Sequence, residues 1–172
     1  KFMNSNKNII FLGMMGSGKS SIGSLVSKKL DIPFIDIDSL IEEYAGISIK
    51  EIFENNGEDY FRSIEEKITL KSLKSKKNII ALGGGGFIND KIRKNILSNH
   101  LSFWLDWDES ILLKRIRNCK KRPLAFKSTD KEIKAIIKKR TKIYSKAQFK
   151  INCNKLTKIE IQKKIIQIYE LN

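Results

Sequence analysis

The chain has 172 residues, 41% hydrophobic and 31% charged, which suits a single domain with a full apolar core over 1–172. Its 34 basic and 19 acidic residues give a net charge of +15, but the lysines are spread over many segments, as is typical of solvated faces. No apolar run approaches the roughly 18 residues that cross a bilayer, and the N-terminal segment is polar, so we expect no membrane partner and no secretory leader.

Short apolar runs along the chain predict the strands of a sheet. They lie at 8–12, 34–38, 78–82, 101–105 and 149–153. Most of these runs are almost wholly apolar, which is typical of parallel strands that are covered on both faces.

Segments with helical periodicity lie between these runs. We expect helices over 19–30, over 39–76 in pieces broken near Gly46 and Gly57, over 90–98, 109–117 and 131–146, and at the C-terminus. Strands that alternate with helices indicate a three-layer α/β/α domain with a parallel sheet. Ligands of such sheets bind beyond the carboxyl ends of the strands, so we expect the chemistry there.

The stretch GMMGSGKS, residues 13–20, follows the first strand and opens the first helix. It fits the phosphate-loop pattern G-x-x-x-x-G-K-[ST], in which backbone N–H groups and the positive end of the helix bind phosphate oxygens. Lys19 would bridge the β- and γ-phosphates, the Ser20 hydroxyl would ligate Mg²⁺, and at least one of Met14 and Met15 would face the cleft. The predicted nucleotide-binding residues are Gly13, Met14, Met15, Gly16, Ser17, Gly18, Lys19, Ser20 and Ser21.

Two carboxylates, Asp36 and Asp38, end the second predicted strand. In an extended segment, residues two apart point to the same side, so both would face the nucleotide cleft. One could hold water on Mg²⁺ while the other accepts a proton from an alcohol. A second interpretation stays open, in which Asp38 only caps the helix that follows.

Four glycines, Gly83–Gly86, follow the third predicted strand. They would let a ligand approach the backbone closely, or would supply several N–H donors; a flexible loop is the alternative. A Walker-B strand would end here, yet this one carries no aspartate. The segment therefore argues against a motor protein or a GTPase and leaves metal coordination to Asp36.

Arginine is scarce in this lysine-rich chain. The planar guanidinium fork suits carboxylates, phosphates and aromatic faces, so each arginine marks a candidate site. The six arginines are Arg62, Arg93, Arg115, Arg117, Arg122 and Arg140. Arg122 lies in the basic loop 118–130, which would suit a mobile lid over a triphosphate; a solvated basic loop is the alternative.

Together these motifs resemble the shikimate kinase family of nucleoside-monophosphate-kinase-like P-loop proteins. The resemblance covers nearly the whole chain and rests on the order of GMMGSGKS, FIDID, GEDYFRSIEEK, IIALGGGG, KRPL and the R-x-x-x-Y of Arg140–Tyr144. It implies a five-stranded parallel sheet in the order 2-3-1-4-5, a shikimate-binding region at 38–66 and a lid at 118–130. It also implies transfer of the γ-phosphoryl group of ATP, with Mg²⁺, to the 3-hydroxyl of shikimate, a step towards chorismate and the aromatic amino acids.

The resemblance also implies roles on the acceptor side. Asp38 would hold the shikimate hydroxyls and act as the catalytic base. Arg62 and Arg140 would grip the substrate carboxylate. The glycines lining the substrate would be Gly83, Gly84 and Gly85.

On the nucleotide side, the resemblance implies that Lys19 and Arg122 contact the transferred phosphoryl group and that Arg115 packs on adenine. Asp36 would bind Mg²⁺, mostly through water, together with Ser20. The chain departs from the family pattern at two positions. They are Ser21, where threonine is common, and Gly86, where alanine or serine is usual.

Two other functions compete with this hypothesis. A gluconate kinase, or another sugar-acid or nucleotide kinase, would share the phosphate loop, but the Arg62 and Arg140 clamp and the glycine run argue against it. A nucleic-acid-binding P-loop module would suit the positive charge, but no aromatic platform interleaved with basic residues is evident in the sequence. We therefore expect a monomer with shikimate and ATP as partners and no nucleic acid. Cys119 and Cys153 lack metal or redox spacing and indicate a reducing, cytoplasmic compartment.

Overall fold

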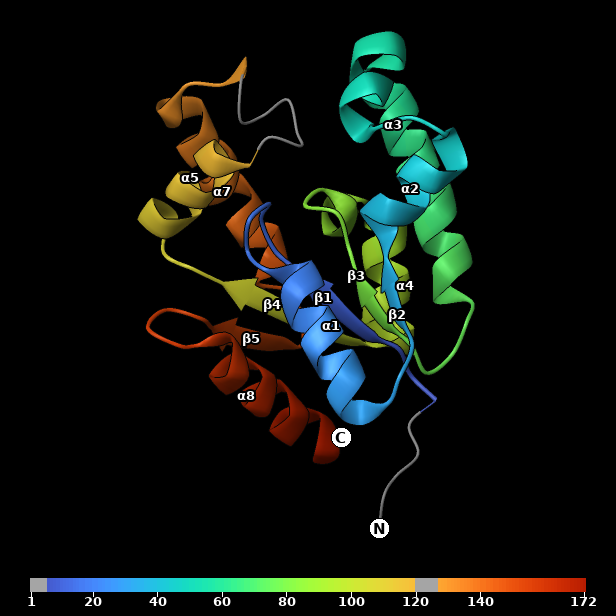
Figure 1. The fold of residues 1–172 in the computed structure, drawn as a ribbon, viewed down its shortest axis with the longest axis vertical. Coiled ribbons are helices and arrows are strands. Elements are labelled where there is room, and N and C mark those ends of the chain that lie inside the picture. The colour runs from blue at the N-terminus through green and yellow to red at the C-terminus, as the bar shows by residue number, and fades with distance from the viewer. Residues whose placement is uncertain (1–5, 120–126) are drawn as a thin grey trace.

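The computed structural model describes residues 6–119 and 127–172, so Arg122 and the KRPL motif lie outside the described residues (Figure 1). The strands are β1 (Ile9–Leu12), β2 (Phe34–Asp36), β3 (Ile79–Ala81), β4 (Leu101–Asp106) and β5 (Phe149–Asn152). The helices are α1 (Lys19–Leu30), α2 (Ile37–Ala45), α3 (Ile49–Leu73), the 3₁₀ turn η1 (Gly86–Ile88), α4 (Asp90–Asn99), α5 (Glu109–Asn118), α7 (Asp130–Tyr144) and α8 (Lys158–Glu170).

The five strands form one sheet in the order β2-β3-β1-β4-β5, and every pairing is parallel. In the centre of the sheet, Ile9 of β1 lies between Ile79 of β3 and Leu101 of β4. The observed order confirms the fold and the strand order that the sequence resemblance implied.

The two faces of the sheet bury separate apolar clusters, because alternate residues of a strand point to opposite sides. Ile10 and Leu12 of β1 belong to the cluster under α3, α4 and α7. Ile9 and Phe11 belong to the cluster under α1 and α8. The helices therefore cover both faces, which confirms the three-layer arrangement. No helix within the described residues is long and apolar enough to cross a membrane.

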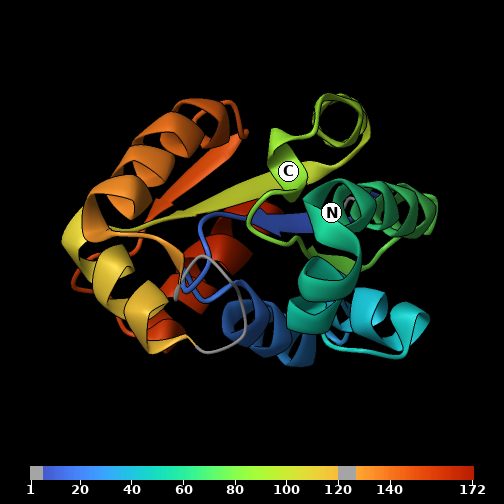
Figure 2. The same ribbon diagram turned by 90° about the horizontal axis from the view of Figure 1, so that it is seen from above.

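The loops at the carboxyl ends of the strands lie between two groups of helices. Figure 2 shows α2 and α3 on one side of the phosphate loop and α5 and α7 on the other. The long α3 is interrupted at Gly57, whose φ of 82° and ψ of 176° are not helical, and Gly46 ends α2, so both predicted breaks are confirmed. The two helical groups thus face one another across the end of the sheet where the predicted site residues lie.

Candidate active site

The phosphate loop joins β1 to α1. Gly16 and Gly18 have φ values of 80° and 89°, in the left-handed region that favours glycine. The Lys19 side chain lies across the loop, where its Nζ atom donates hydrogen bonds of 2.9 Å to the carbonyl oxygens of Gly13 and Met14. The loop therefore holds a buried ammonium group where the backbone is shaped to receive an anion.

A pocket of about 280 Å³, here called the phosphate-loop pocket, opens beside this loop. Its lining residues are Met15, Gly16, Gly18, Lys19, Ser20, Ser21, Asp36, Asp38, Leu82, Gly84 and Cys119. The structure thus brings the loop, both aspartates and one glycine of the run 83–86 into one cavity. Met15 faces the cleft as expected, whereas Met14 is buried.

Asp36 caps helix α2, which corrects the sequence analysis in two respects. β2 ends at Asp36 and the helix begins at Ile37, so Asp38 lies in the first helical turn and not in a strand. The capping residue is Asp36, because its Oδ1 atom accepts a hydrogen bond of 3.2 Å from the Ser39 N–H. Both carboxylates nevertheless line the phosphate-loop pocket.

The two predicted magnesium ligands lie in direct contact. The Ser20 hydroxyl donates a hydrogen bond to Asp36 Oδ2. A hydroxyl and a carboxylate are hard oxygen donors of the type that Mg²⁺ prefers, and this ion usually takes its remaining ligands from water and substrate phosphates. No cluster of three or more histidine, cysteine, aspartate or glutamate side chains that could hold a metal ion occurs in residues 6–119 and 127–172.

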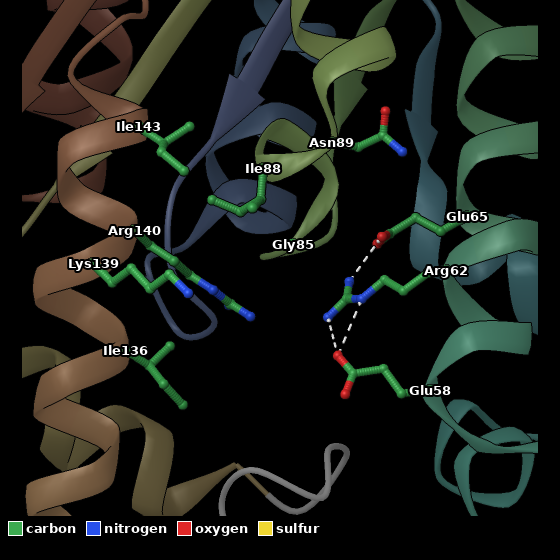
Figure 3. Close-up of a pocket in the computed structure, with 10 residues that line it drawn as sticks. All are labelled: Glu58, Arg62, Glu65, Gly85, Ile88, Asn89, Ile136, Lys139, Arg140 and Ile143. Carbon is green, nitrogen blue, oxygen red and sulfur yellow. Dashed lines mark hydrogen bonds and ion pairs between the residues drawn. The ribbon is translucent and has the colours of Figure 1, made fainter.

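A second pocket, of about 390 Å³, lies between α3, α7 and the segment after β3; we call it the arginine pocket (Figure 3). Its lining residues are Glu58, Arg62, Glu65, Gly85, Ile88, Asn89, Ile136, Lys139, Arg140 and Ile143. Arg62 from α3 and Arg140 from α7 point towards one another across it (Figure 3). The two pockets adjoin, because Gly84 lines the first and Gly85 the second.

The two arginines of this pocket differ in their partners. Arg62 Nη1 donates to Glu65 Oε1 at 2.8 Å, and Arg62 Nε and Nη2 lie 3.4 and 3.3 Å from Glu58 Oε1. Glu65 is only 2% exposed, so the guanidinium stabilises a buried carboxylate. Arg140 makes no ion pair with any carboxylate in the described residues. The pocket therefore contains one guanidinium whose charge is balanced by carboxylates, that of Arg62, and one that makes no ion pair within the described residues, that of Arg140.

Tyr144 connects helix α7 to both loops. Its buried hydroxyl donates a 2.5 Å hydrogen bond to the Gly84 carbonyl oxygen and lies 3.6 Å from Met14 Sδ. Arg140 Nη1 is 4.0 Å from the same sulfur. The R-x-x-x-Y motif thus fixes one turn of α7 against the glycine run and the phosphate loop, because residues four apart share a helix face.

Arg115 of α5 lies on the phosphate loop. Its Nη1 atom donates a 3.2 Å hydrogen bond to the Gly16 carbonyl oxygen, and its guanidinium carbon lies 3.8 Å from the ring centre of Trp107. A cation over an indole face is an attractive contact. The arginine predicted to bind adenine is therefore held beside the phosphate loop.

Arg93 and Arg117, for which the sequence analysis predicted no role, support neighbouring segments. Arg93 donates to the carbonyl oxygens of Phe87 and Ile88 at 3.1 and 3.0 Å, which fixes η1 at the edge of the arginine pocket. Arg117 pairs with Asp130 at 2.6 Å and so joins the end of α5 to the start of α7.

The two cysteines lie in different environments. Cys119 lines the phosphate-loop pocket. Cys153 is buried, and this burial raises the pKa of its thiol to about 12, which keeps it protonated at neutral pH. The two cysteines therefore differ in position, and Cys153 serves as an apolar core residue.

Sequence reasoning missed Glu65 and Trp107. Glu65 stands three residues after Arg62, a spacing that brings two side chains together on a helix and could have marked it as a partner. Trp107 lies in a turn outside every motif, and its contact with Arg115 depends on the packing of α5 against the end of β4. Only the folded structure reveals it.

The chain is similar to known proteins over almost its full length. A family model described as shikimate kinase matches residues 15–170. The shikimate kinase of Thermodesulfovibrio yellowstonii is 39% identical over 165 residues, 95% of each chain. The solved shikimate kinase of Acinetobacter baumannii, in complex with shikimate, has 28% identity and a TM-score of 0.89 over 95% of this chain and 92% of that one. The Aquifex aeolicus shikimate kinase structure has 36% identity and a TM-score of 0.85 over 95% of this chain and 96% of that one.

Proposed function

This chain belongs to the shikimate kinase family, and we propose that its two adjoining pockets form one site in which the γ-phosphoryl group of ATP passes to the 3-hydroxyl of shikimate. The products are shikimate 3-phosphate and ADP. The observation that carries the proposal is the pair Arg62 and Arg140, which face one another across the arginine pocket next to the phosphate loop.

The arginine pocket takes the carboxylate of the acceptor. Arg62 already balances Glu58 and Glu65, so the charge of Arg140 is available for an incoming anion. A guanidinium binds a carboxylate through two parallel N–H donors, which fixes the orientation of the acid as well as its position. The ring of the acceptor then lies along Gly83, Gly84 and Gly85, and its hydroxyls reach towards Asp38.

The phosphate-loop pocket takes the donor. Backbone N–H groups of residues 13–21 and the Lys19 ammonium bind the phosphates of ATP. The guanidinium of Arg115 packs against the adenine ring. Arg122, outside the described residues, is assigned to the transferred phosphoryl group on its sequence motif. Phosphoryl transfer requires mainly positioning and charge stabilisation, and these groups supply both.

Asp38 completes the reaction from the first turn of α2. It holds the acceptor hydroxyl in line with the γ-phosphate and takes its proton as the new P–O bond forms. Ser20 and Asp36 would hold Mg²⁺, which when bound neutralises charge on the phosphate oxygens. The lid over 118–130, a monomeric state and a cytoplasmic location are parts of the same proposal.

The test is an assay of ADP release with a panel of acceptors. Shikimate should support turnover well above the background hydrolysis of ATP, because its ring holds the hydroxyl at a fixed position relative to the carboxylate that the arginines bind. Gluconate, whose open chain does not fix that position, and nucleoside monophosphates, which carry no carboxylate, should not. Faster turnover with gluconate or with a nucleoside monophosphate would assign the chain to another kinase reaction of the same fold.

A further inference from the structure

Trp107 lies in the turn between β4 and α5 and forms a stacked pair with Arg115. The guanidinium carbon is 3.8 Å from the ring centre, which is the closest cation–ring contact among the described residues. Both side chains are only partly buried. A guanidinium is flat and has two faces, so an arginine that contacts an aromatic ring on one face can bind a further planar group on the other.

Both members of the pair are also attached to the phosphate loop. The Trp107 indole N–H donates a 2.8 Å hydrogen bond to the Ser17 carbonyl oxygen, and Arg115 donates to that of the adjacent Gly16. A Cβ atom on Gly16 would lie only 3.0 Å from Arg115 Cβ, so the loop and α5 are in close contact here. The stacked pair and the phosphate-binding backbone therefore keep a fixed relative position.

We propose that Trp107 is a positioning residue for the nucleotide. It supports Arg115 so that the outer face of the guanidinium receives the purine base, giving a three-layer stack of indole, guanidinium and base. An arginine side chain that is already ordered loses less conformational freedom when a ligand binds, which favours affinity. The proposal deepens the proposed function, on which it rests, by naming a residue that acts on the base through Arg115.

The first test separates stacking from hydrogen bonding. Trp107→Leu removes the aromatic face and should raise both the Kd and the KM for ATP by up to about tenfold, the scale of ordering one long side chain when a ligand binds. Trp107→Phe keeps an aromatic face and loses only the N–H donor, so its effect should be about threefold or less. The KM for shikimate and kcat should change less than twofold in both variants. Lys150→Met is the matched control, because it removes a second tryptophan–cation pair of the described residues, Lys150 over Trp104 at 5.1 Å, and should leave ATP binding unchanged.

The second test is spectroscopic and does not depend on turnover. The chain has two tryptophans, so Trp104→Phe leaves Trp107 as the single indole reporter. ADP should change its fluorescence, and the additional change Arg115→Met should abolish that response at ADP concentrations that still saturate the protein by calorimetry. If Trp107→Leu does not fold by circular dichroism, Trp107→Met, which also removes the aromatic face, replaces it in the binding comparison.

The outcomes separate this inference from the proposed function. An ATP Kd that stays within twofold of the wild type in Trp107→Leu overturns the role of Trp107; so does a reporter signal that survives Arg115→Met. The spectroscopic test stands even if Trp107→Leu does not fold. If ADP does not change the Trp107 fluorescence of the Trp104→Phe protein, the inference is overturned. A protein that binds ATP as expected but does not phosphorylate shikimate overturns the proposed function and leaves the positioning role supported.

Discussion

The guanidinium of Arg62 lies directly against the backbone of Gly85. A Cβ atom on Gly85 would stand 2.1 Å from Arg62 Nη1, a distance that real Cβ atoms do not show, so a side chain here must displace the arginine. The next residue, Gly86, differs, because the nearest atom to its Cβ position is Leu82 Cβ at 3.4 Å. A side chain at Gly85 would therefore move the Arg62 guanidinium, whereas one at Gly86 would not.

This contrast predicts opposite results for two neighbouring alanines. Gly85→Ala should raise the KM for shikimate about tenfold or more, because it displaces Arg62, one of the two guanidinium groups between which the carboxylate is proposed to bind. Gly86→Ala should leave that KM unchanged and increase the free energy of unfolding by about 0.4–1 kcal/mol, because alanine restricts the unfolded chain. Steady-state kinetics and urea unfolding measure the two effects. Equal KM values for both variants would contradict the contact.

The arginine pair predicts a specific loss of acceptor binding. Arg140→Ala should raise the KM for shikimate about 10- to 100-fold, the scale of a lost charge-assisted hydrogen bond, with little change in the KM for ATP. Arg62→Ala should have the same effect and should also destabilise the fold, because it leaves the buried Glu65 without its partner. Lys138→Ala, an exposed change on the same helix as Arg140, is the control. A shikimate KM that is unchanged in both arginine variants would exclude the clamp.

The aspartate of α2 predicts a loss of turnover without a loss of nucleotide binding. Asp38→Asn should lower kcat by about 10²- to 10⁴-fold, because the amide cannot take the proton of the hydroxyl. The Kd for ATP, measured by calorimetry, should remain within about twofold. Glu43→Gln removes one negative charge from an exposed position of the same helix and should retain full turnover. Turnover of Asp38→Asn at the wild-type rate would reject Asp38 as the base.

His100, the single histidine of the chain, predicts a pH-dependent stability. It is 7% exposed and its Nδ1 atom accepts a 3.4 Å hydrogen bond from the Asn8 N–H. Burial, and then the nearby Lys7 charge, lower the pKa of His100 in the folded protein. Its contribution to stability is therefore present above about pH 6.5 and is lost as the pH falls below that value, because the unfolded chain takes up the proton first. Its NMR titration should have a midpoint below pH 6.5; a midpoint at or above this value would contradict the assignment.

The sequence predicted the centre of the sheet well because β1, β3 and β4 are short, mostly apolar runs such as IIFL, which are buried in the structure. It failed at Asp36 and Asp38 because the start of α2 is decided by hydrogen bonds that Asp36 receives from Ser39 and from the distant Ser20. The sequence analysis nevertheless placed these residues correctly at one site, because the phosphate loop, the aspartates and the glycines all follow strands of one parallel sheet. The stack of Trp107 on Arg115 depends on helix packing, which no local pattern records.

Identification of the product by ³¹P and ¹H NMR tests the central claim most directly. With ATP, Mg²⁺ and shikimate, the protein should give equal amounts of ADP and of one new phosphate ester whose phosphorus couples to the proton on C3 of the shikimate ring. ADP accompanied only by inorganic phosphate, or an ester at another hydroxyl, would contradict the proposed two-substrate site.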